Sequence, residues 1–445
     1  YRKRFFCEKK PGKQYEIYFD GVYMDCTVYL NRQVLGEWKY GYSSFYFDMT
    51  DFLCEGENEI VVQVRFLGPN SRWYSGAGIY RNVYLTEYGE NHFVTDGVYL
   101  TTDEKKDGWQ LTVEAELAWN RQPEGGTDTY CVEISVTDLS GTPVAEECCP
   151  LYGKETMFDY ILKLPQVVPW SLQKPALYLC SLKLMGDDGK KLEDEVCQRI
   201  GFRRFSFDTE KGFFLNGVHT KLNGVCEHHD LGALGAAFHR MAMRRKMLIL
   251  KEMGVNSIRC AHNMPAPELL DLADEMGILI VDEAFDMWER AKTPYDYARF
   301  FPEWYQRDVK SWICRDRNHP CILFWSIGNE IYDTHVSERG QEVTRLLYDE
   351  VRRYDPRGHA MVTIGSNFMP WENARKCADI LKFAGYNYGE KYYEEHHKKH
   401  PDWYVYGSET SSTVQSRGIY HFPYRQSVLA DEDEQCSSLG NSSTS

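Results

Sequence analysis

The sequence predicts a multidomain protein in which a jelly-roll β-sandwich and an immunoglobulin-like β-sandwich precede a (β/α)8, or TIM, barrel. Three observations predict this order. Residues 1–92 alternate apolar and polar positions, residues 93–203 repeat the alternation in shorter strands, and in residues 204–445 apolar runs alternate with helical stretches. A length of 445 residues also fits about three domains of ordinary size.

The first predicted domain, residues 1–92, consists of strands separated by turn residues. Residues 15–21, 26–31 and 58–65 alternate apolar and polar side chains. No helical period persists in this domain. The pattern is typical of an all-β sandwich, and we expect a jelly roll.

The second predicted domain, residues 93–203, has shorter strands. Its clearest strands are residues 111–117, 131–136 and 178–184. Short strands spread over about 110 residues fit an immunoglobulin-like sandwich.

The third predicted domain, residues 204–445, repeats strand–helix units, which predicts a parallel sheet. Its strands are continuously apolar, as expected for a sheet covered on both faces. We expect strands at residues 221–225, 257–259, 278–281, 322–325, 360–363, 383–386 and 404–407, and helices near 238–253, 266–276, 303–317 and 337–354. These are seven strands, whereas a barrel closes with eight. Because the tail from Asp431 is acidic and then Ser-rich, we expect the chain to stop before its last barrel strand; a flexible C-terminus is the alternative.

Composition argues against several kinds of partner. The chain has 51 basic and 66 acidic side chains and a formal net charge of −15, which disfavours nucleic acid and anionic membranes. It has no run of about 18 apolar residues, so we expect no membrane-spanning helix. Aromatic residues make up 14% of the chain. Sugar rings stack on aromatic planes, but the cores of β-sandwiches also favour aromatic residues.

The 14 cysteines form no zinc-binding pattern, and Cys148 and Cys149 are adjacent. They are scattered among apolar strands and helices, which predicts buried free thiols in a reducing compartment. No signal peptide is visible, so we expect a cytoplasmic protein, although the chain begins at Tyr1 rather than at Met. Whether the chain forms a homo-oligomer stays open.

The segment Trp325–Glu330, Trp-Ser-Ile-Gly-Asn-Glu, is the sharpest chemical signal. An apolar strand runs into Asn329 and Glu330 at its carboxyl end, which is the end of a barrel strand that faces the active site. Asn329 can donate to a sugar hydroxyl while Glu330 points at a leaving-group oxygen. The alternative is that this pair caps the next helix. The elaborate polar run before the strand, Arg315–Pro320, favours the active-site interpretation.

A second strand, Tyr404–Gly407, leads into Ser408 and Glu409. By our count the two glutamates end the fourth and the seventh strand, which face each other across the mouth of a barrel. Two facing carboxylates about 5–5.5 Å apart define a retaining glycosidase. For Glu409 alone, a surface position in a Ser/Thr-rich loop is the alternative.

These residues resemble glycoside hydrolase family 2, which includes β-galactosidases, β-glucuronidases and β-mannosidases. The resemblance covers the whole chain, and Arg315–Glu330 is similar almost position for position to the acid/base signature of the family. It implies that Glu330 is the acid/base, that Asn329 contacts the 2-hydroxyl of the sugar and that Glu409 is the nucleophile.

The resemblance implies further substrate-binding residues. His228, in Gly224–His228, and His262, in Arg259–His262, would line the pocket, and Arg259 would orient the nucleophile. Tyr388 would hydrogen-bond the nucleophile, with Tyr386 as its rival. A turn histidine is the alternative for His228.

The resemblance also covers a loop of the first domain, Asn70–Arg81, that would reach toward the active site. Asn70, Arg72 and Trp73 are its candidates for substrate contact, although a contact between domains is the favoured alternative. Some β-galactosidases of the family have an Asp in this loop where this chain has Asn70–Ser71.

The segment after the third barrel strand resembles the family with one departure. Asp282 and Glu283 match the strand ending and are expected to be structural rather than catalytic. Met287 and Glu289 stand where some relatives have magnesium ligands. Because a thioether binds hard cations poorly, we expect neither a catalytic metal nor another cofactor.

The sequence therefore predicts a retaining exo-β-glycosidase that acts on terminal, non-reducing β-linked sugars of a carbohydrate substrate. The run Tyr406–Ser412 and the segment Arg417–Tyr420 look more like galactosidase-type members of the family, and this resemblance implies a β-galactosidase. A β-glucuronidase, β-galacturonidase or β-mannosidase is the alternative within the family, and a protein that binds glycans without cleaving them is the alternative outside it.

Overall fold

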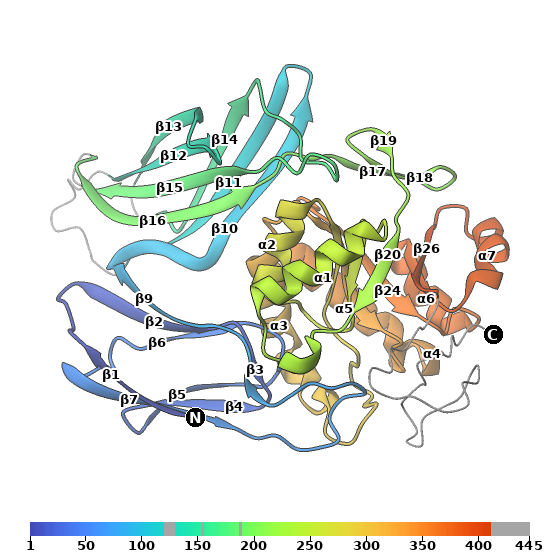
Figure 1. The fold of residues 1–445 in the computed structure, drawn as a ribbon, viewed down its shortest axis with the longest axis horizontal. Helices are drawn as coiled ribbons and strands as arrows, with labels where there is room; N and C mark the ends of the chain where they lie inside the picture. The colour runs from blue at the N-terminus through green and yellow to red at the C-terminus, as the bar shows by residue number, and fades with distance from the viewer. Residues whose placement is uncertain (120–129, 153–154, 187–188, 411–445) are drawn as a thin grey trace.

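The computed structural model describes residues 1–119, 130–152, 155–186 and 189–410. Two β-sandwiches lie beside each other, and the strand–helix units of the third part lie against them (Figure 1). The predicted fold class, with a jelly-roll sandwich, an immunoglobulin-like sandwich and a parallel βα barrel domain, is confirmed.

The first sandwich consists of two antiparallel sheets with strand orders β1–β7–β4–β5 and β6–β2–β9 and a short β3–β8 ladder. Phe19, Val28 and Leu30 are almost fully buried between the sheets. Polar residues alternate with these apolar ones, so each strand presents one face to the core. The strands are β1 Arg2–Cys7, β2 Lys13–Phe19, β3 Val22–Tyr23, β4 Cys26–Leu30, β5 Gln33–Trp38, β6 Phe45–Asp48, β7 Gly56–Val64, β8 Gly78–Ile79 and β9 Val83–Gly89.

The second sandwich packs a three-stranded sheet, β10–β11–β14, on a four-stranded sheet, β13–β12–β15–β16. Leu111, Val113 and Ala115 alternate along β11 and are fully buried. The strands are β10 Asn91–Lys105, β11 Gly108–Trp119, β12 Tyr130–Asp138, β13 Pro143–Leu151, β14 Met157–Leu164, β15 Tyr178–Gly186 and β16 Lys191–Ile200. A small antiparallel sheet follows, with β17 Phe205–Asp208, β18 Gly212–Leu215 and β19 Val218–His219.

The third part contains a parallel sheet of seven strands that neighbour one another in chain order from β20 to β26. Every residue of β22, β23 and β25 is buried, as predicted for strands covered on both faces. The strands are β20 Gly224–Glu227, β21 Ser257–Cys260, β22 Leu279–Glu283, β23 Ile322–Asn329, β24 Met361–Ser366, β25 Phe383–Asn387 and β26 Tyr404–Glu409.

Helices follow or interrupt these strands. The α-helix α2 begins with proline at its first position and ends at Gly277, which adopts a left-handed conformation with φ 66° that suits glycine. The helices are α1 Arg240–Glu252, α2 Pro267–Met276, α3 Phe301–Asp316, α4 Asp333–Val336, α5 Arg339–Tyr354, α6 Glu372–Leu381 and α7 Tyr393–Lys399, with the 3-10 helices η1 Gly232–Leu234, η2 Tyr297–Arg299 and η3 Glu390–Tyr392.

Two details of the barrel differ from the prediction. The first strand begins at Gly224 rather than at residue 221, because the Asn256 side chain hydrogen-bonds the backbone of Lys221 and Asn223 in place of a strand ladder. The sequence analysis also missed α6 and α7, which are short helices of ten and seven residues. Arg417–Tyr420 and the tail from Asp431 lie outside the described residues.

The polar run Arg315–Pro320 joins all three parts of the chain. Arg315 donates to Ser44 Oγ of the first sandwich at 3.0 Å and forms an ion pair with Asp316. Asn318 accepts from the backbone N–H of Leu100 in the second sandwich at 2.8 Å. The use of this run as support for an active site was therefore wrong, because its polar groups satisfy contacts between domains.

The 13 cysteines of the described part are free thiols. Four of them, Cys54, Cys148, Cys197 and Cys226, are exposed, so the expectation that the thiols are buried was wrong for these residues. No helix within the described ranges combines the length and apolar character needed to cross a bilayer.

Candidate active site

Glu330 follows the last residue of β23 and adopts a left-handed backbone conformation with φ 46°. This conformation is uncommon for a residue with a side chain and is often found at functional sites. The Glu330 N–H donates to Gly365 O at 2.8 Å, which fixes the turn. The Glu330 carboxylate accepts from Asn387 Nδ2 at 3.1 Å and lies 3.5 Å from Arg72 Nη1. Its side chain is therefore held at the rim of the sheet and is 14% exposed.

Glu409 is the last residue of β26, and three side chains surround its carboxylate. Arg259 Nη1 donates to its Oε1 at 2.7 Å, and Tyr388 OH donates to its Oε2 at 2.6 Å. His262 Nε2 lies 3.6 Å from Oε1. These contacts fix both oxygens of the carboxylate, as a nucleophile in a defined position requires.

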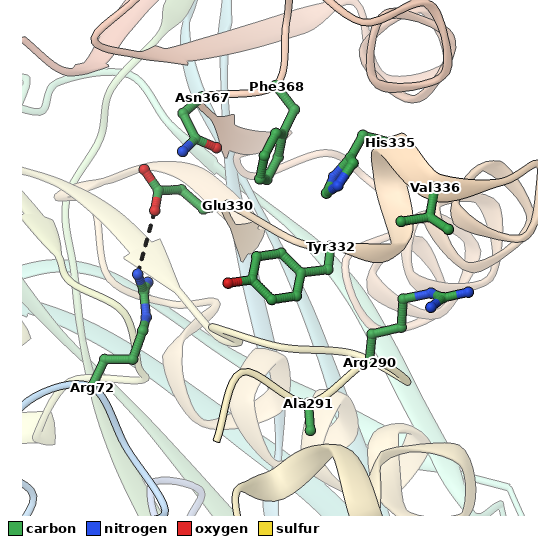
Figure 2. Close-up of a pocket in the computed structure, with 9 residues that line it drawn as sticks. All are labelled: Arg72, Arg290, Ala291, Glu330, Tyr332, His335, Val336, Asn367 and Phe368. Carbon is green, nitrogen blue, oxygen red and sulfur yellow. Dashed lines mark hydrogen bonds and ion pairs between the residues drawn. The ribbon is translucent and has the colours of Figure 1, made fainter. Parts of the chain in front are cut away.

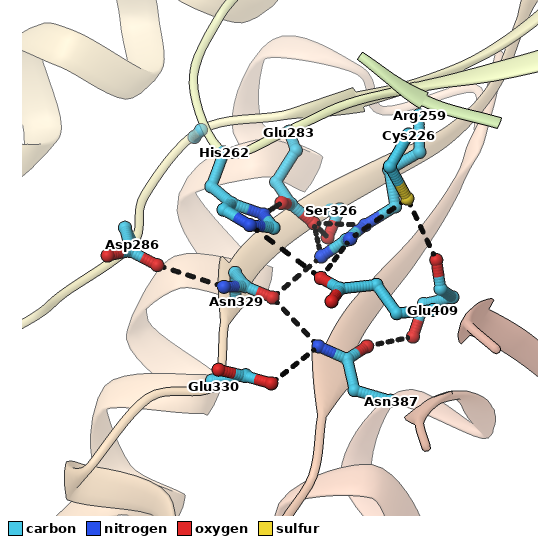
Figure 3. A network of polar contacts seen from close by, with 12 residues as sticks. Cys226, Arg259, His262, Glu283, Asp286, Ser326, Asn329, Glu330, Asn387 and Glu409 are labelled. Carbon is cyan, nitrogen blue, oxygen red and sulfur yellow. Dashed lines mark hydrogen bonds and ion pairs between the residues drawn. The ribbon is translucent and has the colours of Figure 1, made fainter. Parts of the chain in front are cut away.

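The two glutamates belong to one network of buried polar groups (Figure 3). Asn387 donates to both Glu330 and Asn329 Oδ1, the latter at 3.0 Å. Arg259 Nη2 donates to the same Asn329 oxygen at 2.8 Å while its Nη1 binds Glu409. The structure therefore brings Glu330, Glu409, Asn329 and Arg259 together, although they come from three different strands and the turns that follow them.

The surroundings of Glu409 keep its carboxyl ionised. Burial by itself raises the pKa of this carboxyl, but the positive charge of Arg259, together with His262 and the Tyr388 hydrogen bond, outweighs burial. The pKa of Glu409 is therefore below its ordinary value. An ionised carboxylate is the form that can attack carbon.

Glu283 lies beneath this pair and is completely buried. It accepts from Arg259 Nε at 2.9 Å, from Ser326 Oγ at 2.6 Å and hydrogen-bonds His262 Nδ1 at 2.7 Å. Glu283 thus orients Arg259 and His262, two of the three side chains around Glu409, as the sequence analysis expected of a structural residue. Asp282 is also fully buried.

Asp286, Lys292 and Arg72 form a second charged group behind Asn329. Asp286 Oδ1 accepts from Arg72 Nη2 at 2.6 Å, from Lys292 Nζ at 2.8 Å and from Asn329 Nδ2 at 2.9 Å. Burial raises the pKa of Asp286, but Lys292 and Arg72 lower it to about 2. Lys292 also donates to the backbone carbonyl of Asn329 at 2.8 Å, so hydrogen bonds fix both the side chain and the backbone of this residue.

The remaining predicted residues lie beside the network. The Trp73 ring is 5.0 Å from the His228 ring and 5.4 Å from the His262 ring, measured between centroids. Burial lowers the pKa of His228 to about 4, so its ring is neutral at pH 7. Asn70 is different, because it is buried and its Oδ1 accepts from Tyr23 OH at 2.9 Å within the first sandwich. The Asn70 side chain therefore makes a structural contact within the first sandwich, whereas the Trp73 and His228 rings lie at the edge of the candidate site.

Tyr388, rather than its rival Tyr386, contacts the nucleophile candidate. Tyr386 is fully buried, and its hydroxyl hydrogen-bonds His396 Nδ1 at 2.9 Å. Tyr388 has φ 52°, and its N–H donates to Glu409 O at 2.7 Å. The left-handed turn at Tyr388 is what directs its ring to the rim instead of the core.

A cavity of about 670 Å3 opens beside Glu330 (Figure 2). Such a volume lies in the range of about 300–1,000 Å3 that is usual for ligand pockets. Figure 2 shows Arg72 reaching Glu330 from one side while Tyr332 and Phe368 stand on the other. The cavity is lined by Arg72, Arg290, Ala291, Glu330, Tyr332, His335, Val336, Asn367 and Phe368.

The positions discussed for a metal have other roles. Met287 is buried, and Glu289 forms an ion pair with Arg339 at 2.6 Å. Asp274, His319 and Cys321 offer ligand atoms within 4.8 Å of one another. Asp274 accepts from the Cys321 N–H at 3.0 Å and hydrogen-bonds His319 at 2.6 Å, so these groups already satisfy one another.

Sequence reasoning missed Asn387, Asp286 and Lys292. Asn387 ends β25, so the strand-end position that identified Glu330 could have found it. Asp286 follows β22 by three residues and carried the same signal more weakly. Lys292 lies in a loop whose sequence gives no indication of its position.

Comparison with known families and proteins agrees with this architecture. Residues 1–89 match the sugar binding domain of glycosyl hydrolases family 2, residues 92–203 match glycosyl hydrolases family 2, and residues 208–409 match its TIM barrel domain. The chain belongs to glycosyl hydrolase family 2.

Three of the relatives come from species of the genus Bacteroides. The chain is 39% identical to the β-galactosidase BoGH2A of Bacteroides ovatus, over 99% of this chain and 56% of that protein. It is 29% identical to a β-glucuronidase of Bacteroides fragilis, over 92% of this chain and 61% of that protein. A crystal structure of a family 2 member from Bacteroides cellulosilyticus superposes with a TM-score of 0.86 at 36% identity, over 92% of this chain and 52% of the other. The chain thus spans somewhat more than half the length of these relatives.

Proposed function

We propose that the protein is a retaining exo-β-glycosidase that hydrolyses terminal, non-reducing β-linked sugars. The observation that carries the proposal is the single network in which Asn387, Asn329 and Arg259 connect the carboxylates of Glu330 and Glu409. Two carboxylates held at the ends of different parallel strands are what a double displacement at an anomeric carbon requires.

Glu409 is the nucleophile of the proposed reaction. Its ionised carboxylate attacks the anomeric carbon and forms a glycosyl ester while Glu330 donates a proton to the leaving oxygen. Glu330 then takes a proton from water, which attacks the same carbon and releases the sugar with retention. The differences in surroundings support this assignment, since a cation contacts Glu409 at 2.7 Å whereas the cation nearest to Glu330 is 3.5 Å away.

The neighbouring residues position these groups. Arg259 and Tyr388 hold the nucleophile, and Asn329 has its oxygen satisfied by Arg259 and Asn387. Because hydrogen bonds that strengthen in the transition state contribute most to rate, we assign Asn329 to the 2-hydroxyl of the sugar. We propose that the rings of His228, His262 and Trp73 also contact the sugar.

The sugar is proposed to be β-D-galactose. The support is the similarity to a β-galactosidase at 39% identity, against 29% for a β-glucuronidase. A panel of nitrophenyl β-glycosides distinguishes the galactoside from the glucuronide, galacturonide and mannoside. Failure to cleave the galactoside while cleaving another member would reassign the sugar and leave the mechanism intact.

Substitution of each carboxylate tests catalysis. Glu330→Gln and Glu409→Gln are each expected to lower kcat/KM by about 100- to 10,000-fold, the usual contribution of such a group. Glu289→Gln is the matched control, because Glu289 lies near the same rim but pairs with Arg339. Unchanged rates in the first two variants would support a protein that binds glycans without cleaving them.

The nucleophile can be identified by trapping. A 2-fluoro-glycoside slows release of the glycosyl ester, and peptide mass spectrometry then locates it. We expect the adduct on Glu409, and an adduct on any other residue would contradict the assignment.

We also propose that the protein works in a reducing compartment such as the cytoplasm, which the 13 free thiols of the described residues support. Cell fractionation followed by detection of the protein tests this location. Recovery in the secreted fraction would contradict it.

A further inference from the structure

Two cavities lie beyond Glu330 and share the lining residue His335. The first, of about 670 Å3, contains Glu330 at its edge (Figure 2). The second, of about 450 Å3, is lined by His335, Pro370, Trp371, Glu372 and Asn373. Together they extend from the rim of the barrel at β23 to the beginning of α6.

The first cavity adjoins the acid/base candidate Glu330 and is not lined by the nucleophile candidate Glu409. Its lining includes Glu330 but none of the residues that contact Glu409, namely Arg259, His262 and Tyr388. An acid that protonates a leaving group stands between the bond that breaks and the departing molecule. The space that Glu330 lines and Glu409 does not is therefore the space of the leaving group.

Aromatic rings line this space. The His335 and Phe368 centroids are 3.8 Å apart, and His335 is 5.2 Å from Trp371 and 6.0 Å from Tyr332. Trp371 is 57% exposed and Tyr332 is 40% exposed, so neither ring is committed to the core. Burial lowers the pKa of His335, which keeps its ring neutral at pH 7.

Polar side chains stand among the rings. Asn367 lines the first cavity beside Phe368, and Asn373 lines the second beside Trp371. Arg290 is exposed at the edge of the first cavity. A sugar ring presents apolar C–H faces and a border of hydroxyls, which suits rings interleaved with amides. A purely apolar leaving group would leave these amides unused, so the lining favours a saccharide.

We propose that these two cavities bind the leaving group as a saccharide of two or more units, with its second unit on the Trp371 ring. The inference rests on the proposed glycosidase function and narrows its substrate to a terminal sugar on an oligosaccharide. Tyr332 and Phe368 flank the first unit next to Glu330, and Trp371 with Asn373 holds the next one.

Substrates of increasing length test the proposal on the full protein. We expect kcat/KM to rise from lactose, whose leaving group is one glucose, to β-galactosyl-cellobiose, whose leaving group is two. Trp371→Ala is expected to lower kcat/KM on the longer substrate about tenfold, mainly through KM, because a stacking contact is lost. Hydrolysis of nitrophenyl β-galactoside should stay unchanged. Tyr152→Ala is the matched control, because Tyr152 is a 77% exposed ring on the second sandwich.

Binding without cleavage separates this proposal from the function itself. Calorimetry with cellobiose, the free two-unit leaving group, should show binding to the native protein and to Glu330→Gln, and weaker binding to Trp371→Ala. Absence of heat at millimolar cellobiose, or equal loss of activity on all three substrates in Trp371→Ala, would overturn the proposal even where nitrophenyl galactoside is cleaved. If no glycoside is cleaved but cellobiose binds through Trp371, the glycosidase function fails while the saccharide site remains.

Discussion

Glu330 and Glu409 have the same side chain, and their neighbours make them different. Glu409 has a guanidinium, a phenol and an imidazole around its two oxygens, and its pKa is lowered. Glu330 accepts a hydrogen bond from the Asn387 amide at 3.1 Å and has the Arg72 guanidinium 3.5 Å away. A carboxylate surrounded by donors suits attack on carbon, whereas one with fewer charged partners suits exchange of a proton.

Removal of one donor tests this difference. Tyr388→Phe deletes the 2.6 Å hydrogen bond to Glu409 and leaves the ring. We expect kcat/KM to fall about 10- to 100-fold, the effect of losing a hydrogen bond to a charged group. Because that hydrogen bond lowers the pKa of Glu409, its loss raises the pKa, and the acidic limb of the pH profile should move to higher pH.

Tyr386→Phe is the control for this measurement, since its hydroxyl contacts His396 and not the site. If the acidic limb of the pH profile has the same midpoint in Tyr388→Phe as in the native protein, this limb does not report the ionisation of Glu409.

At the scale of elements, α3 couples the barrel to the first sandwich through a buried carboxyl. Asp308, on α3, accepts from Ser43 Oγ of the first sandwich at 2.6 Å and from Tyr297 OH. It has no exposed surface, and burial raises its pKa to about 7, although the hydrogen bonds from Ser43 and Tyr297 oppose this rise. The joint between the two domains is therefore most stable when Asp308 carries a proton.

This coupling predicts a dependence of stability on pH. The folded state holds the Asp308 proton up to about pH 7, whereas an unfolded Asp ionises near its ordinary pKa of 3.8. The stabilisation is fully present below pH 3.8 and is lost as pH rises through about 7. Asp308→Asn mimics the protonated form, so its Tm should fall less than that of the native protein between pH 5 and pH 8.

We expect the difference to be several degrees, because about 1 kcal/mol shifts the Tm of a domain of 150–250 residues by about 2–4 °C. Differential scanning calorimetry of both proteins in the same buffers measures it. Parallel Tm curves would mean that Asp308 is already ionised in the folded state at pH 5.

Across the molecule, the candidate active site includes a residue from another domain. Arg72 comes from a loop of the first sandwich, and it forms an ion pair with Asp286 at 2.6 Å and approaches Glu330 at 3.5 Å. The first sandwich thus places a positive charge beside Glu330.

Arg72→Gln tests this contribution. We expect kcat/KM to fall about tenfold or more, because Glu330 loses its nearest cation and Asp286 loses one of its hydrogen-bonding partners. The Tm should also fall, because Asp286 is only 2% exposed and keeps Lys292 as a cationic partner but loses Arg72. Steady-state kinetics and calorimetry on the same preparation measure both quantities.

Arg65→Gln provides a control in the same sandwich. Arg65 is exposed, and its ion-pair partner at 3.8 Å is Asp25, which belongs to the first sandwich. Equal activity in Arg72→Gln and Arg65→Gln would show that the first sandwich supplies no charge to the reaction.

Local sequence patterns predicted the order of the three folds and selected the two glutamates as catalytic candidates. Alternation of apolar and polar residues is a local property, and so is the presence of a carboxylate at the end of a buried strand. Because parallel barrel strands end at one rim, the position of Glu330 and Glu409 along their strands was enough to predict that they share a site.

Which other side chains reach that rim became evident from the three-dimensional fold. Arg72 lies 214 positions before its partner Asp286, and Asn387 lies 57 positions after Glu330, so no local pattern relates them. The same holds for Arg315–Pro320, whose polar groups resembled an active-site entrance in the sequence but join the domains in the fold. Such contacts depend on how loops pack across domain boundaries, which is a property of the assembled molecule rather than of any segment.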